Sequence, residues 1–115
     1  ISLTDAIGSG VIPPIKISGD VMETSPVKLY GPKGAVELNE GLIVALRHIH
    51  CATQQAAKLG LKKGNTVNIA VEGVRKVVFE NVVARVGDNY TFCLHLDTDE
   101  GNAAGINKAG EGIIL

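Results

Sequence analysis

The chain has 115 residues, a length that suits a single domain able to bury roughly two-thirds of its unfolded surface. Hydrophobic residues make up 45% of it and charged residues 20%, and the net charge of −1 offers no basic surface for nucleic acid or anionic lipid. Aromatic residues are scarce and tryptophan is absent, which argues against base stacking, and no apolar run reaches the roughly 18 residues that span a bilayer. We therefore expect a globular chain with no nucleic-acid or membrane partner.

Two features bear on the origin of the chain. Its two cysteines, Cys51 and Cys93, are too few for a disulfide framework and are expected to be reduced thiols, so we predict a cytoplasmic protein. The first residue is Ile1 rather than methionine. We therefore expect a piece of a longer protein.

The first half of the chain alternates between short apolar segments and turn residues. A capped helical turn is predicted over residues 4–10, with Thr4 or Asp5 supplying the capping oxygen. Strands are expected over residues 15–17, 27–30, 35–38 and 41–50. The loop at residues 31–34 could cradle a phosphate, but it lacks the spacing and the following helix of such loops, so we interpret it as a hairpin turn. Residues 39–41 are predicted to form another turn.

The second half continues in the same style. A helix is predicted over residues 53–59, with Thr53 as N-cap and Gly60 as its stop, and a second short helix over residues 102–104, opened by residues 97–100 and ended by Gly105. Strands are expected over residues 66–71, 74–79, 82–86, 90–96 and 111–115. Many short strands with few small helices are typical of a mainly β protein with short α-helices, here a small, partly closed β-barrel that forms one domain over residues 1–115.

The only three histidines fall in two of the predicted strands. Alternation along a strand places His48 and His50 on one face and Arg47 and Ile49 on the other, while His95 lies in a later strand. Three imidazoles from two strands could bind a divalent metal and leave positions open for water or substrate. The alternative is that these histidines are only hydrogen-bonded or exposed at strand ends.

Other polar residues near the histidines have two interpretations each. The acidic residues 97–100 could orient a histidine or act as a base, or they could form a capping box for the following helix. Cys51 or Cys93 could bind zinc as a thiolate, although a small buried hydrophobic residue is the simpler interpretation. Arg47 could hold a phosphate or carboxylate, or form a salt bridge on the face opposite the histidines.

Four segments together resemble one known family. They are the glycine-rich hairpin of residues 31–38, the apolar residues 41–45, the Arg-His-Ile-His sequence of residues 47–50 and the Leu-His-Leu-Asp-Thr-Asp-Glu sequence of residues 94–100. The chain is similar over nearly its whole length to the C-terminal half of the phosphate propanoyltransferases (phosphotransacylases) of propanediol utilization. Cys51, where methionine is common, and Gly101, where alanine is usual, are minor departures.

The resemblance implies a fold and an activity. Members of the family have two similar β-barrels with zinc ions between them, and convert acyl-CoA (propanoyl-CoA or acetyl-CoA) and phosphate to acyl phosphate and CoA. By the resemblance, His48, His50 and His95 hold one zinc ion, and His95 and Asn102 lie near CoA. The second zinc, the phosphate contacts and the connection into residues 1–25 involve an N-terminal half, so the catalytic residues are left unassigned here and this segment alone is expected to be inactive. A homo-oligomer is a further expectation.

Two alternatives from other classes remain open at the level of sequence. One is a non-catalytic, metal-stabilised β-barrel module that binds a partner. The other is a hydrolase that uses water on a three-histidine zinc site.

Overall fold

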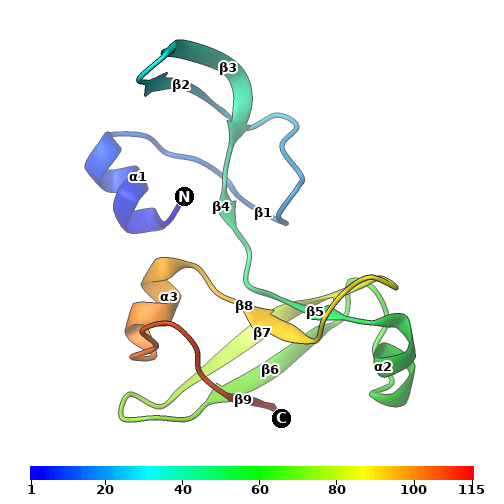
Figure 1. Ribbon diagram of the computed structural model, residues 1–115. Coiled ribbons are helices and arrows are strands. Elements are labelled where there is room, and N and C mark those ends of the chain that lie inside the picture. The colour runs from blue at the N-terminus through cyan, green and yellow to red at the C-terminus, as the bar shows by residue number, and fades with distance from the viewer. The chain divides into compact units, whose positions relative to one another are not determined.

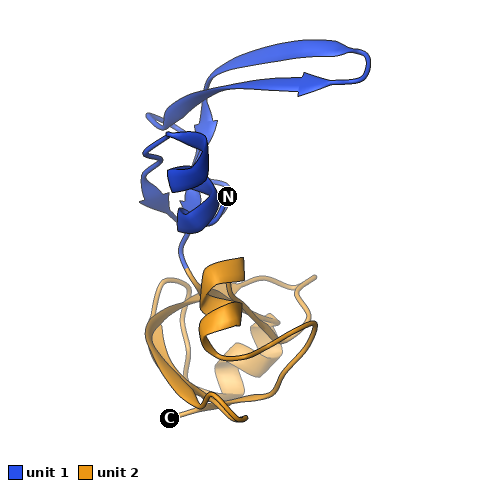
Figure 2. Ribbon diagram, turned by 90° about the vertical axis from the view of Figure 1, so that its left-hand side faces the viewer, with its two compact units in different colours: residues 1–46 blue, residues 47–115 orange.

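The computed structural model describes all residues from Ile1 to Leu115. The chain divides into two compact units, residues 1–46 and residues 47–115, which Figure 2 shows in different colours. Its elements in order are α1 (Leu3–Ser9), β1 (Ile15–Lys16), β2 (Ser25–Gly31), β3 (Gly34–Leu42), β4 (Val44–Ala45), β5 (His48–Cys51), α2 (Thr53–Lys58), β6 (Thr66–Val71), β7 (Val77–Val86), β8 (Cys93–His95), α3 (Thr98–Ala103) and β9 (Gly112–Ile114). That residues 1–115 act as one domain stays a prediction.

The first unit begins with helix α1, whose cap differs from the prediction. The side chain of Ser2, rather than Thr4 or Asp5, accepts a hydrogen bond from the backbone N–H of Asp5. Ser2 has the extended backbone of an N-cap, whereas Thr4 and Asp5 already lie inside the first turn. The helix ends at Gly10, whose φ of 69° is the left-handed conformation that glycine adopts without strain.

Strands β2 and β3 form an antiparallel hairpin with its tight turn between Gly31 and Gly34, which confirms the predicted hairpin turn. The turn predicted at residues 39–41 is wrong, because β3 continues to Leu42. Two hydrogen bonds join its last residues to the segment before β2. The N–H of Gly41 donates to the Thr24 hydroxyl, and the Glu40 carboxylate accepts from the N–H of Glu23.

The hairpin has one apolar and one polar face. The directly paired residues Val27 and Leu38 share a face, as do Leu29 and Val36 two residues further along each strand. On the opposite face Lys28 forms an ion pair with Glu37. Leu29 and Val36 are 51% and 50% exposed, so the apolar face has little cover within its own unit.

The strand predicted over residues 41–50 is wrong as one continuous element. It is divided into the end of β3, the short strand β4 and the strand β5. Strand β4 pairs in parallel with β1, whereas β5 pairs with β7 and β8 in another sheet. The chain therefore has to leave one sheet and enter another between Ala45 and His48, and the apolar run cannot stay straight.

The second unit is a curled five-stranded sheet in the order β8-β5-β7-β6-β9. Strands β5 and β7 run parallel and the other neighbours run antiparallel. Figure 1 shows the sheet curled into part of a barrel, with α2 and α3 at opposite ends. The mainly β fold with short helices and a partly closed β-barrel is thereby confirmed.

Strand β7 replaces two predicted strands. Residues 77–86 form one strand, and residues 74–76 lie outside it. Asn81, at the predicted break, has a φ of 57° and its N–H donates to the Asn68 side chain, while the pairing of β6 with β7 shifts register between Val67 and Ile69. A β-bulge thus absorbs the irregularity without ending the strand.

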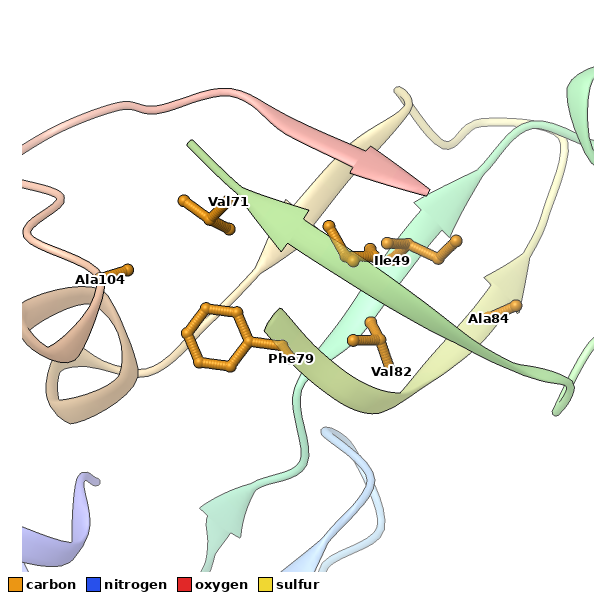
Figure 3. Close-up of a cluster of buried hydrophobic side chains, with 7 residues drawn as sticks. Ile49, Val71, Phe79, Val82, Ala84 and Ala104 are labelled. Atoms are coloured by element: carbon orange, nitrogen blue, oxygen red, sulfur yellow. The ribbon is translucent and has the colours of Figure 1, made fainter. Parts of the chain in front are cut away.

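The hydrophobic core of the second unit lies inside the curl of its sheet. Figure 3 shows its side chains on the strands of the sheet, together with Ala104 beside α3. The buried cluster comprises Ile49, Ile69, Val71, Phe79, Val82, Ala84 and Ala104. Ile49 is 1% exposed, so its side chain lies on the face of β5 that packs into the core. Because side chains alternate along a strand, His48 and His50 lie on the opposite, outer face.

The two helices of the second unit begin differently from one another. At α2 the predicted cap is wrong: Ala52 occupies the N-cap position, and the hydroxyl of Thr53 donates to Asp88 instead. At α3 the predicted capping box is confirmed, because the Asp97 carboxylate accepts from the N–H of Glu100 and the Glu100 carboxylate accepts from the N–H of Asp97. None of the helices has the length and apolar character needed to cross a membrane.

Candidate metal centre

The three histidines come together on the outer face of the second sheet. His48 and His95 are directly paired across β5 and β8, and His50 follows two residues later on the same face of β5. The rings of His48 and His95 stack with their centroids 4.9 Å apart. The centroid of the His50 ring lies 4.2 Å from that of His95 and 5.1 Å from that of His48. Their possible ligand atoms all lie within 4.8 Å of one another, so this group could hold a metal ion.

Strand order explains why His95 meets His48 and His50, which lie 47 and 45 positions before it in the sequence. Strand β5 lies between β7 and β8, so its side chains are flanked on both sides by ordered neighbours. Ile49, packed in the core, fixes which way β5 faces, and period-two alternation then directs His48 and His50 to the same side. A short antiparallel pairing with β8 adds His95.

One atom in this group has an unusual environment. Nε2 of His50 is buried and has no hydrogen-bond partner. A buried polar atom without a partner costs about 1–3 kcal/mol, and such atoms are rare in folded proteins. A metal ion bound by the three imidazoles would give this nitrogen a partner, so the residues present fit a metal site.

The charge states of the histidines also fit metal binding. Burial, followed by the neighbouring His95, His48 and Arg85, lowers the pKa of His50. Burial, followed by His48 and Arg85, lowers the pKa of His95, although His95 is the most exposed of the three side chains. A lowered pKa keeps an imidazole neutral near pH 7, and the neutral imidazole is the form that coordinates a metal.

Two residues that the sequence did not single out lie beside His50. The ring of Tyr90 stacks on the His50 ring at 4.1 Å with an interplanar angle of 8°. Arg85 places its guanidinium carbon 5.8 Å from the centre of the Tyr90 ring and is the direct partner of His50 in the pairing of β5 with β7. No local sequence pattern predicts that Arg85 or Tyr90 lies beside His50. Their positions depend on how β7 and the loop before β8 align with β5, which is far from both in sequence.

The two cysteines differ in environment. Cys51 is fully buried, which confirms its interpretation as a small core residue, and burial raises the pKa of its thiol. The same interpretation is wrong for Cys93, which is exposed. The Cys93 Sγ atom lies 3.0 Å from Nε2 of His95, because residues two apart in β8 share a face. Cys93 is outside the group of ligand atoms that lie within 4.8 Å of one another.

Arg47 and the acidic residues near it form a separate structural network. The Arg47 guanidinium pairs with Glu100 at 2.7 Å through Nη1 and donates to the carbonyl of Glu80 through Nε. This confirms the predicted salt bridge of Arg47. Asp97 and Glu100 serve as the capping box of α3, and Glu100 in addition anchors Arg47.

Asn102 lies in α3, where its side chain is exposed. It lines a cavity of about 650 Å³ in the second unit, together with residues from β8, β9 and the loop after α3 that include Cys93 and Lys108. The histidines are not among the lining residues. A role for Asn102 or His95 in binding CoA stays a prediction.

Comparison with known proteins gives a consistent result. A family model described as phosphate propanoyltransferase matches residues 1–107. A phosphate propanoyltransferase from Lachnoclostridium phytofermentans is 45% identical over 106 residues, covering 92% of this chain and 50% of the relative. Those from Priestia megaterium and Listeria monocytogenes are 40% and 37% identical over 114 and 115 residues, covering 99% and 100% of this chain and 52% and 54% of the relatives.

The chain thus spans about half the length of the curated relatives it matches. The matched region includes both strands that carry the histidines. With a family match over nearly all its residues, the chain belongs to the phosphate propanoyltransferase family.

Proposed function

We propose that this chain is the C-terminal part of a metal-dependent phosphate acyltransferase. The reaction transfers a short acyl group, propanoyl or acetyl, between CoA and phosphate. The observation that carries the proposal is the three-imidazole group of His48, His50 and His95 in a chain whose relatives are named phosphate propanoyltransferase. In the forward direction a phosphate oxygen forms a bond to the thioester carbonyl carbon, the carbon–sulfur bond breaks, and CoA leaves as a thiolate that takes up a proton.

The histidines would hold a zinc ion, the metal that the family resemblance implies. When bound, such an ion acts as a Lewis acid that polarises a carbonyl or positions a phosphate. The contribution of this chain is the fixed orientation of its imidazoles. Paired strands hold His48 and His95, and the Tyr90 ring covers His50. The lowered pKa values of His50 and His95 favour the neutral imidazole, which is the form that binds a metal.

The remaining parts of the site follow from the same proposal. Asn102 and His95 would contact CoA, and the cavity beside Asn102 offers room for part of it. A second zinc ion and further phosphate contacts would come from the N-terminal half of the protein, with residues 1–25 forming the connection. Residues 1–115 would then be the C-terminal of two similar barrels, in a cytoplasmic protein that forms a homo-oligomer.

The test is release of CoA from propanoyl-CoA by the complete protein that contains this chain. We expect the free thiol of CoA to appear only when phosphate is present, and acyl phosphate to form in equal amount. Treatment with a chelator should abolish the reaction and zinc should restore it. CoA release without phosphate would instead identify a hydrolase, and no release with a fully metal-loaded protein would favour a non-catalytic module.

A further inference from the structure

Arg85 lies on the same face of the sheet as the metal-binding histidines. In strand β7, Val82 and Ala84 point into the core, so Arg85 points outward, and it is the register partner of His50 in the neighbouring parallel strand. Tyr90 links the two side chains. Its ring stacks on His50 at 4.1 Å, and the Arg85 guanidinium carbon lies 5.8 Å from its centre. Arg85 is also close enough to lower the pKa values of both His50 and His95.

No carboxylate neutralises Arg85. The four ion pairs of the structure use other cations. Asp88, the acidic residue closest to it in sequence, accepts a hydrogen bond from Thr53, and Glu100 pairs with Arg47. Arg85 is only partly exposed to solvent, so water screens its charge incompletely.

This leaves an excess of positive charge once a metal is bound. The candidate ligand group consists of three imidazoles with no carboxylate among them, so it would not offset the charge of a divalent ion. A guanidinium beside such an ion is repelled by it, and the repulsion is largest where solvent is partly excluded. An anion between the guanidinium and the metal ion would be attracted by both and would offset their mutual repulsion.

We propose that Arg85 is an anion-binding residue of the metal centre and holds the phosphate group of a substrate next to the three histidines. The planar guanidinium can donate two parallel hydrogen bonds to a phosphate, which an ammonium group cannot do in the same geometry. The Tyr90 ring supports the guanidinium through a cation–π contact and limits its motion. The inference rests on the proposed acyltransferase function, whose substrates supply the phosphate group either as inorganic phosphate or as part of CoA.

Arg47 provides a matched control. It carries the same charge in the same unit and directly precedes β5, but its guanidinium is already satisfied by Glu100 and by the Glu80 carbonyl. The two arginines therefore differ in whether a partner is present. Removal of Arg47 should affect folding stability, whereas removal of Arg85 should affect anion binding.

The experiment compares Arg85→Gln, Arg85→Lys and Arg47→Gln in the complete, zinc-loaded protein. Inorganic phosphate, CoA and pantetheine, which lacks phosphate groups, are titrated separately by calorimetry, and zinc per chain is measured for each variant. We expect Arg85→Gln to keep its zinc and to weaken binding of either inorganic phosphate or CoA by about 10- to 100-fold, the effect of losing hydrogen bonds to a charged group. Arg85→Lys should recover part of the loss, and pantetheine binding should not change.

The two ligands distinguish the source of the phosphate group. Weakened binding of inorganic phosphate assigns Arg85 to the attacking phosphate, and weakened binding of CoA assigns it to the CoA phosphates. Unchanged affinity for both, loss of zinc in Arg85→Lys, or an equal loss of affinity in Arg47→Gln would overturn the proposal.

The result is also separate from the test of the proposed function. If phosphate-dependent CoA release occurs and Arg85→Gln leaves the KM of both substrates unchanged, Arg85 is excluded while the acyltransferase stands. If Arg85 governs anion binding but no phosphate-dependent release occurs, the anion site stands and the acyltransferase is rejected.

Discussion

Ile49 decides the direction of the two histidines that flank it. It is 1% exposed and belongs to the core cluster, while His48 and His50 occupy the other face of β5. A register slip of one residue would turn both histidines toward the core and turn Ile49 to the opposite face of the sheet. Burial of Ile49 therefore decides which face of β5 carries two of the three residues of the candidate metal centre.

The two thiols should differ sharply in reactivity. Cys93 is exposed, whereas Cys51 is buried. Burial raises the pKa of the Cys51 thiol, so its reactive thiolate forms at a higher pH than that of an ordinary cysteine. We expect iodoacetamide at pH 7.5 to label the folded, metal-free protein once, at Cys93, and to label it twice in urea. Mass spectrometry of wild-type and Cys93→Ser protein reads this out. Rapid labelling of Cys51 in the folded protein would contradict its burial.

The metal-free protein should lose stability in mild acid. Folding lowers the pKa of His50 and His95, so between their folded values and the unfolded value of about 6.5 the unfolded chain binds more protons. The stabilising contribution is complete above about pH 6.5 and declines as pH falls through the lowered folded pKa values. Urea midpoints measured in chelator from pH 7.5 to 5.0 should decrease, and His50→Gln should decrease less steeply. Parallel curves for the two proteins would argue against a lowered pKa at His50.

Alternation along the sequence predicted that His48 and His50 share a face, but it did not predict which residues lie beside them. The common face of His48 and His50 follows from a spacing of two, which is a local property. The stacking of Tyr90 and the approach of Arg85 depend on how β7 and the loop before β8 align with β5, and that alignment is set by tertiary packing.

The elements show where local signals compete with pairing. The capping box of α3 was predictable because its contacts span three residues. The division of residues 41–50 was not, since the apolar run looks uniform although β4 pairs with β1 and β5 with β7. The sequence pattern indicates that residues 41–50 are extended, but the points at which the strand is interrupted depend on which strands each part pairs with.

The capping box of α3 can be tested directly. Replacing Asp97 by alanine removes the carboxylate that accepts from the Glu100 N–H, and should lower the free energy of unfolding by about 1 kcal/mol. Asp97→Asn keeps a side-chain oxygen and should cost much less. Urea unfolding of the two variants measures the difference, and equal stability of Asp97→Ala and wild type would mean that the cap does not stabilise the helix.

Strand β9 should tolerate no side chain at Gly112. A Cβ there would lie 2.9 Å from Cγ2 of Ile69 and 3.4 Å from the Ala70 carbonyl, inside the β6–β9 pairing. We expect Gly112→Ala to reduce the free energy of unfolding by about 1–3 kcal/mol through overpacking. Gly8→Ala in α1 is the control, because nothing lies near its Cβ and alanine favours a helix by about 0.5–1 kcal/mol. A destabilised Gly8→Ala together with an unaffected Gly112→Ala would contradict both assignments.

At the scale of the whole molecule, the two units differ in how they bury apolar residues. The core cluster belongs to the second unit, whereas the first unit leaves one face of its hairpin half exposed. The barrel class was predictable from the number and length of the strands, but the division at residue 46 was not, because composition does not change there. The chain also spans about half of its relatives, so its activity is a property to test in the complete protein.

The most direct test of the three-histidine metal centre is the metal content of this chain and of its histidine variants. After loading with zinc and extensive dialysis, elemental analysis should find one zinc ion per wild-type chain, and His48→Ala, His50→Ala and His95→Ala should each bind substantially less because one of three ligands is lost. Arg47→Gln, which leaves the ligands in place, should retain its zinc. Wild-type protein without stoichiometric metal, or His95→Ala with unchanged zinc, would contradict the three-histidine metal centre.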